Sequence, residues 1–262
     1  MTARHVEANG VRIALDSVGR GPLLILIHGG EAGRGMYANL APLLADAFMV
    51  ASYDQRDTGD TLANPTRYMM EDLGADLAAL IQALGHSRAH VFGTSFGSLI
   101  AQEAALAFPN AIDRLILSAP LREPRNDLNP AAISLAAAAA QGDASAASRF
   151  AALMFAPGAT VARPDLLDTL SAINAPRTLE QSARRREAAR ACSTTTRLQR
   201  IAAPTLVMCG GGDQIISPDV AYAIARAAPN ADFTMLAGLG HALTLEAPRR
   251  VAAAIRTFLQ SK

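Results

Sequence analysis

Lysine is almost missing from this 262-residue sequence: Lys262 is the only one, and the other basic residues are arginines. A phosphate-binding P-loop requires a lysine directly after its glycines. A Schiff-base enzyme and a Tyr-x-x-x-Lys reductase each require a lysine in the active site. The sequence therefore excludes these three kinds of site, and the glycine-rich stretch at 29–35 is not read as a nucleotide-binding loop.

Cysteine, excess charge and long apolar runs are scarce as well. Cys192 and Cys209 are isolated thiols without C-x-x-C spacing, which argues against a disulfide framework or a zinc site. A formal net charge of +1 gives no electrostatic footprint for nucleic acid or an anionic membrane. The first ten residues hold no apolar signal segment, and the run 131–140 is too short to cross about 30 Å of hydrocarbon. We expect a cytoplasmic protein without nucleic-acid or membrane partners, and leave its oligomeric state open.

Strand and helix patterns alternate through most of the chain. Asn9-Gly10 joins two alternating strands as a hairpin, and the continuous apolar runs 22–30 and 112–120 are typical of strands buried on both faces. Further strands are expected at 48–54, 89–93, 204–210 and 231–238, and helices at 36–46, 68–84, 96–108, 217–228 and 246–260. This alternation predicts an α/β fold with a mainly parallel, doubly wound sheet and an antiparallel N-terminal hairpin.

The segment 121–200 interrupts the alternation. It has helical periodicity but no strand-like run, while the strands on either side of it continue the sheet. We therefore expect one core domain made of 1–120 and 201–262, with 121–200 inserted as a helical lid (cap).

A single serine stands where a predicted strand meets a predicted helix, in the pentapeptide Gly93-Thr94-Ser95-Phe96-Gly97. A serine that only caps the helix would explain Ser95 but not glycines on both sides of it. G-x-S-x-G between a strand and a helix is typical of a sharp turn that raises a nucleophilic serine at the carboxyl end of the sheet. Ser95 is therefore the candidate nucleophile.

A serine nucleophile requires a base, which must itself be oriented by a third group. Of the five histidines, only His241 lies in a loop after the last predicted strand; His28 ends a strand and is expected to be a packing residue. The candidate acid is Asp213, directly beyond the strand 204–210. Asp219 is its rival, but it stands where the next helix begins and fits better as a first-turn acid.

Five segments look like the successive landmarks of the α/β-hydrolase superfamily: HGG, YDQRDTGD, GTSFGS, GGGDQIISP and GLGHALTLEAP. The first three also resemble the proline iminopeptidase branch, although a glycine commonly follows the YDQR arginine there and Asp57 does so here. The resemblance implies a catalytic triad in the chain order Ser95, Asp213, His241. It also implies an oxyanion hole formed by the backbone N–H groups of Gly30 and Phe96, with no cofactor and no metal.

Three classes of function stay open. The first is a serine hydrolase that cleaves a small-molecule ester or lactone through an acyl-enzyme intermediate. The second is the same triad acting on another bond, either a C–C bond of a diketone or the N-terminal residue of a peptide. A peptidase of that kind needs lid acids to hold the substrate ammonium, whereas 121–200 holds eleven arginines and seven acids. The third is a non-catalytic, ligand-binding relative.

Further expectations concern the surroundings of the serine. Four apolar residues, Met36, Tyr37, Met154 and Phe155, are expected to line the substrate pocket. Asp54, Arg56 and Asp57 of YDQRDTGD are expected to form a salt-bridge network in a loop at the rim of the site, with a metal or acid/base cluster as the alternative. The three arginines at 184–186 cannot all face the site, because successive helical residues are about 100° apart. The i,i+4 pair of Glu180 and Arg184 favours a solvated outer face for this run; binding of a substrate carboxylate by a lid arginine is the alternative.

Overall fold

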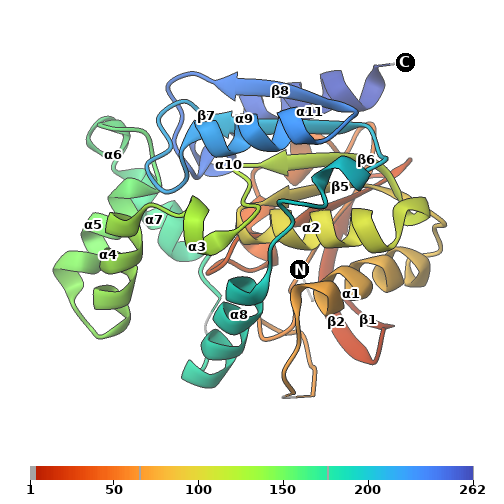
Figure 1. The fold of residues 1–262 in the computed structure, drawn as a ribbon, viewed down its shortest axis with the longest axis horizontal. Coiled ribbons are helices and arrows are strands. Elements are labelled where there is room, and N and C mark those ends of the chain that lie inside the picture. The colour runs from red at the N-terminus through yellow and green to blue at the C-terminus, as the bar shows by residue number, and fades with distance from the viewer. Residues whose placement is uncertain (1–3, 65, 176, 262) are drawn as a thin grey trace.

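One eight-stranded sheet runs through the computed structural model, which describes residues 4–64, 66–175 and 177–261 (Figure 1). The strands lie in the order β1-β2-β4-β3-β5-β6-β7-β8. Their bounds are β1 Arg4–Ala8, β2 Val11–Val18, β3 Leu23–Ile27, β4 Met49–Tyr53, β5 Ala89–Thr94, β6 Ile112–Ser118, β7 Thr205–Gly210 and β8 Ala231–Leu236. The β1–β2 and β2–β4 pairs are antiparallel, and the other neighbouring pairs are parallel. The predicted mainly parallel sheet with an antiparallel hairpin is confirmed.

The apolar residues of β3 are divided between two hydrophobic clusters, one on each face of the sheet. Leu23, Ile25 and Ile27 belong to the first cluster, which also contains residues of α1 (Met70–Ala83), α2 (Phe96–Ala107) and α9 (Pro218–Ala227). Leu24 and Leu26 belong to the second, together with residues of α11 (Pro248–Gln260). Because side chains alternate along a strand, a run that is apolar throughout is required when helices cover both faces.

Two expected helices differ from the structure. The segment 36–46 forms two 3₁₀ turns, η1 (Arg34–Tyr37) and η2 (Ala41–Leu43), because Pro42 has no N–H to continue an α-helix from the preceding turn. The helix expected at 246–260 is α11, which begins two residues later at Pro248, and a separate short helix, α10 (Leu243–Glu246), precedes it. Proline is favoured in the first turn of a helix, and it cannot continue a helix that precedes it, so Pro248 separates α10 from α11.

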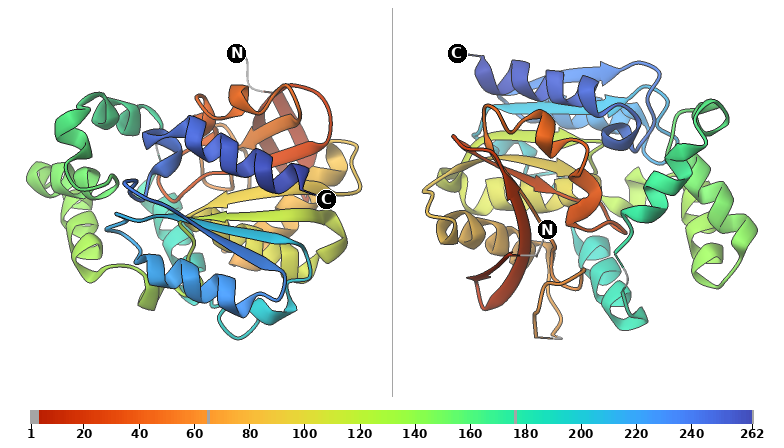
Figure 2. Two further views of the ribbon diagram at one scale, coloured as in Figure 1. Left: turned by 90° about the horizontal axis from the view of Figure 1, so that it is seen from above. Right: turned by 180° about the vertical axis from the view of Figure 1, so that it is seen from behind.

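The segment between β6 and β7 is helical throughout its named elements (Figure 1). These are α3 (Pro124–Asp127), α4 (Pro130–Ala140), α5 (Ala144–Leu153), α6 (Ala159–Ala162), α7 (Asp165–Ala172), α8 (Leu179–Ala191) and the 3₁₀ turn η4 (Leu198–Arg200). Both views of Figure 2 show the green helices beyond one end of the sheet. In Figure 1 this is the end toward which the β8 arrow points, so the segment lies near the carboxyl ends of the parallel strands. Within the residues that the structure describes, none of the helices is long and apolar enough to span a bilayer.

Candidate active site

Ser95 occupies a strained turn between β5 and α2. Its backbone has φ +52° and ψ −118°, a conformation that costs a non-glycine residue about 1–3 kcal/mol. A Cβ on Gly93 would collide with the backbone of Gly97, and one on Gly97 would collide with the carbonyls of Ile27 and His28. The glycines on both sides of Ser95 are therefore required by the close approach of α2 to β5, at Gly93, and to the end of β3, at Gly97.

Ser95, His241 and Asp213 are joined by hydrogen bonds into one chain. Ser95 Oγ lies 3.1 Å from His241 Nε2, and His241 Nδ1 lies 2.8 Å from Asp213 Oδ2. Both partners of the serine are almost fully buried. If Nδ1–H donates to Asp213, Nε2 has a lone pair directed at the serine hydroxyl, which is the arrangement that proton abstraction requires.

The second oxygen of Asp213 holds this carboxylate in place. Oδ1 accepts the backbone N–H groups of Ile215 at 2.8 Å and Ile216 at 2.9 Å. These bonds leave Oδ2 free for His241. Asp219 instead lies in the first turn of α9, two residues after the N-cap Ser217. It is therefore a first-turn acid, as the sequence predicts.

The loop that carries His241 is held by the segment after α5. The N–H of Ala242 donates to the Met154 carbonyl at 2.7 Å, and the N–H of Gly240 donates to Glu246 Oε2 at 2.8 Å. A Cβ on Gly240 would collide with the backbone of Phe155. Glu246 is not among the residues predicted from the sequence; its place five residues beyond His241 is the signal that the sequence offers.

The four apolar residues expected in the pocket pack in or against the second hydrophobic cluster. Met36, Tyr37 and Phe155 are buried in the second hydrophobic cluster, and Met154 packs at its edge. The Tyr37 hydroxyl donates to the Ile27 carbonyl at 2.8 Å. None of the four, all of them described by the structure, is among the residues that line the pocket at Ser95.

The residues expected to form the oxyanion hole are neighbours. Phe96 is the first residue of α2, so its N–H has no acceptor within the helix. A Cβ built on Gly30 would lie 3.9 Å from Phe96 Cβ, which places the loop after β3 against the start of α2. Among the described residues, no hydrogen bond is made by the Gly30 N–H.

His28 is part of the framework of this loop. Its Nδ1 lies 2.8 Å from the Gly29 carbonyl, and the Gln55 side-chain amide donates to the His28 carbonyl at 2.8 Å. Burial, together with the nearby charges of Arg185 and Arg177, lowers the pKa of His28 well below its ordinary value. His28 is therefore a neutral, hydrogen-bonded structural residue at neutral pH.

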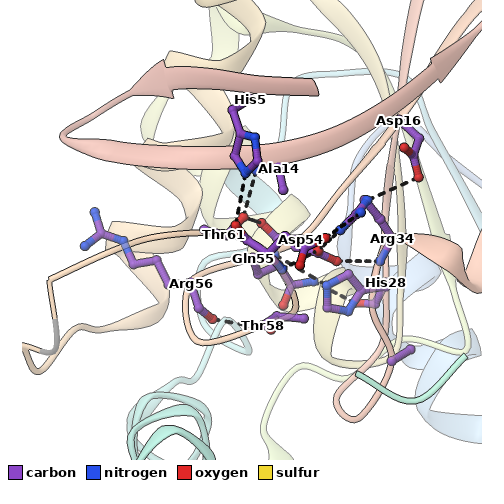
Figure 3. A network of polar contacts seen from close by, with 12 residues as sticks. His5, Ala14, Asp16, His28, Arg34, Asp54, Gln55, Arg56, Thr58 and Thr61 are labelled. Atoms are coloured by element: carbon purple, nitrogen blue, oxygen red, sulfur yellow. Dashed lines mark hydrogen bonds and ion pairs between the residues drawn. The ribbon is translucent and has the colours of Figure 1, made fainter. Parts of the chain in front are cut away.

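The loop after β4 holds the expected salt-bridge network (Figure 3). Arg34 bridges Asp16 and Asp54, and Figure 3 shows it between the two carboxylates. Arg56 donates to Asp76 at 2.6 and 2.8 Å. These buried and half-buried pairs fix the loop next to the β3 end, and this network is confirmed.

A cavity of about 200 Å³ opens at Ser95. Its apolar wall comes from the start of α2, the segment after β6, α3 and α8: Phe96, Leu121, Pro124, Leu128 and Ala189. Its polar wall consists of Gly30, Glu31, Ser95, Arg177, Ser182, Arg185 and Arg186. Among the described residues, no group of three or more His, Cys, Asp or Glu side chains is placed to hold a metal ion.

The solvated outer face expected for the run 184–186 is wrong for Arg185. Arg185 is only 4% exposed, and its guanidinium lies 4.3 Å from the centre of the Phe96 ring. Arg184 donates to both carboxylate oxygens of Asp57, at 2.7 and 2.8 Å. Arg186 is exposed but lines the cavity. The i,i+4 pattern within α8 could not reveal these partners, which lie more than 80 residues away in the chain.

Comparisons with known proteins identify the family of this chain. A family model described as the alpha/beta hydrolase fold matches residues 22–248. A candidate non-heme bromoperoxidase of Mycobacterium tuberculosis, BpoC, is 27% identical over 259 residues (96% of this chain, 98% of that protein). A candidate carbamate hydrolase of Caulobacter vibrioides, RutD, is 26% identical over 274 residues (98% and 95%). The crystal structure of a hydrolase from Pseudomonas aeruginosa has a TM-score of 0.85 at 28% identity, with 99% of each chain covered. Because the family model spans most of the sequence, the chain belongs to the α/β-hydrolase family.

Proposed function

We propose that this protein is a serine hydrolase that cleaves a small-molecule carboxylic ester or lactone. The observation that carries the proposal is the hydrogen-bonded chain from Ser95 Oγ through His241 to Asp213, which ends at a cavity of small-molecule size. The strained backbone of Ser95 supports it, since such strain is common where a side chain does chemistry. The hydrolase names of two of the three compared proteins support it at the level of reaction class.

The proposed reaction begins with attack of Ser95 Oγ on the substrate carbonyl while His241 Nε2 accepts the serine proton. Asp213 holds the imidazole tautomer and stabilises the imidazolium. His241 then donates the proton to the leaving alcohol, which leaves an acyl group on Ser95. A water molecule, deprotonated by His241, attacks this ester and releases the acid.

The backbone N–H groups of Phe96 and Gly30 are the proposed oxyanion donors. Both lie beside Ser95 at the mouth of the cavity, and neither is used up in a strand or a helix ladder. Donors that are fixed before the reaction need no reorganisation as charge develops, and removing one typically costs about 2.7–4 kcal/mol.

We further propose that 121–200 is a lid over this site, with 1–120 and 201–262 as the core domain. Side chains from α3 and α8 line the cavity together with Ser95, which supports this division. The substrate is then enclosed between the two parts. The cytoplasmic location expected from the sequence stays a prediction.

Turnover of 4-nitrophenyl acetate and butyrate by the purified protein tests the proposed function. Ser95→Ala is the matched control, because it removes one oxygen atom and keeps the backbone. We expect release of 4-nitrophenol by the unmodified protein only. Absence of turnover on esters and lactones alike would overturn the proposal, and activity confined to diketones or to aminoacyl substrates would replace it by C–C or peptide-bond hydrolysis.

A further inference from the structure

Arg185 is a buried cation in the wall of the cavity that contains Ser95. It extends from α8, is 4% exposed and lies over the ring of Phe96. Among the residues that the structure describes, no carboxylate lies within ion-pair distance of its guanidinium. Its charge is therefore removed from water without a directly paired carboxylate, which is costly; Glu31 and Asp57 act on it only from a greater distance.

The hydrogen bonds of Arg185 all go to neutral acceptors. Nη1 donates to the Arg56 carbonyl at 3.0 Å, while Nη2 donates to the Gly30 carbonyl at 3.2 Å and to Gln55 Oε1 at 2.8 Å. Burial lowers the pKa of Arg185 to about 10, so the side chain still carries its charge at neutral pH. A guanidinium has five N–H donors, and these contacts leave part of that capacity for a ligand.

Two other arginines make the same wall positive. Arg177 contacts Glu31 at 3.6 Å and donates to the carbonyls of Ala32 and Asp57, so its donors are largely occupied by the protein. Arg186 is exposed at the edge of the cavity. With Glu31 as the only acid among the lining residues, the cavity favours an anion and disfavours a substrate ammonium.

We propose that Arg185 binds a carboxylate of the substrate, so that the ester or lactone cleaved at Ser95 carries a second, free carboxylate. The inference rests on the function proposed above and names the substrate class of the same site. The planar fork of a guanidinium matches the two oxygens of a carboxylate. Since Arg185 lies over Phe96, whose N–H is a proposed oxyanion donor, the carboxylate and the scissile carbonyl are separated by only a few bonds. A half-ester of a short dicarboxylic acid fits both requirements and the cavity of about 200 Å³.

The first experiment compares two esters of one shape on the unmodified protein. Methyl hydrogen succinate carries a carboxylate where methyl levulinate carries a methyl ketone, and methanol release reports hydrolysis of both. We expect kcat/KM to favour the anionic ester by roughly 10- to 100-fold, the range for a hydrogen bond to a charged group. Equal values, or a preference for the neutral ester, would overturn the proposal while leaving the proposed function intact.

Variants then assign the preference to one side chain. Arg185→Gln is expected to reduce the ratio of the two kcat/KM values to near one, whereas Arg190→Gln, an exposed arginine of the same helix, keeps it. A purely structural role of Arg185 would lower both kcat/KM values together and leave their ratio unchanged, which contradicts the proposal. Arg185→Lys keeps the charge without the fork and is expected to keep part of the preference; it also serves if Arg185→Gln fails to fold.

Binding without turnover separates the two proposals. Ser95→Ala is titrated calorimetrically with each ester, because it keeps the cavity and cannot form the acyl-enzyme. We expect the succinate half-ester to bind at least about tenfold more tightly than methyl levulinate, through the charge-assisted bond to Arg185. Selective binding by a protein that hydrolyses no ester would overturn the proposed function but keep the anion site; equal affinities would overturn the anion site.

Discussion

The two walls of the cavity hold their polar groups in different ways. The wall that carries Ser95, His241 and Asp213 is called the core wall. Here the Asp213 carboxylate accepts hydrogen bonds from His241 and from two backbone N–H groups, and the three residues lie in loops after β5, β7 and β8. On the other wall, contributed by the proposed lid and called the lid wall, Arg185 depends on acceptors from segments about 130 to 155 residues away and forms no ion pair within the described residues. The protein itself supplies partners for the Asp213 carboxylate, whereas the charge of Arg185 is left for a bound ligand to pair with. Chemistry and substrate selection should therefore be separable by mutation.

The largest effect is expected at the core wall. Ser95→Ala should lower kcat on any ester substrate by about 10⁶-fold, the loss typical of removing a triad serine. His241→Ala should be about as damaging, since triad members act as a unit. Steady-state kinetics measures both, with urea unfolding to confirm that the fold is kept. Residual turnover within tenfold of the parent in Ser95→Ala would rule out Ser95 as the nucleophile.

The identity of the acid is tested by two matched substitutions. Asp213→Asn should lower kcat by about 10⁴-fold, because an amide at this position favours the wrong imidazole tautomer. Asp219→Asn should leave kcat within a factor of two or so, since this residue stands in the first turn of α9 away from the histidine. A greater loss in Asp219→Asn than in Asp213→Asn would reverse the assignment.

Much of the core wall could be predicted from the sequence because each of its parts depends on local geometry. The glycines around Ser95 are required because a Cβ at either position would collide with nearby backbone. Asp213 and His241 each follow the end of a strand, in segments that resemble those of α/β-hydrolases. The two 3₁₀ turns at 34–43 were missed, because proline effects compete with helical periodicity over so short a segment.

The lid wall could not be predicted in the same way. The inward turn of Arg185 depends on the carbonyls of Gly30 and Arg56 and on the ring of Phe96, none of which lies in its own helix. Helical spacing shows only that three successive arginines point in different directions. Which of them points inward is decided by tertiary contacts.

A smaller effect, on the pH dependence of the free energy of unfolding, is expected from His28, which holds the loop after β3 next to Ser95. Its pKa is lowered in the folded protein, so between that value and the ordinary value of 6.5 the unfolded chain binds a proton that the folded protein does not. The free energy of unfolding should therefore fall as pH falls below about 6.5, by at most about 1.4 kcal/mol per pH unit, and should not depend on this group above that pH.

Urea unfolding of the parent and His28→Asn between pH 5 and 7 measures this contribution. The variant should be less stable at pH 7 but should show a shallower loss toward pH 5. His86→Asn, at a partly exposed histidine, controls for the removal of an imidazole from the chain. Parallel slopes in the parent and His28→Asn would show that His28 is not held neutral by the fold. His90, whose pKa burial also lowers, contributes to the slope that remains.

The smallest effect on the free energy of unfolding is expected at Arg184 and Asp57, whose ion pair joins α8 to the loop after β4. Asp57 has φ +57° and uses its carboxylate to accept two bonds from α8. A left-handed backbone favours glycine, the residue that commonly stands here in the proline iminopeptidase branch. This chain thus accepts a strained backbone and gains a contact with α8. Asp57→Gly should change the free energy of unfolding by less than about 1 kcal/mol, because relief of strain and loss of the ion pair oppose each other.

Asp57→Asn separates the two contributions, since asparagine tolerates the left-handed backbone but loses the charge. It should cost about 1 kcal/mol, and Arg184→Gln a similar amount, with the double variant no worse than either single one. Arg190→Gln, on the same helix, should have no effect in the same urea titrations. If Asp57→Gly proved as costly as Asp57→Asn, the backbone at this position would not be strained. Additive losses in the double variant would show instead that Arg184 and Asp57 act independently, and that the lid is held to the core by other contacts.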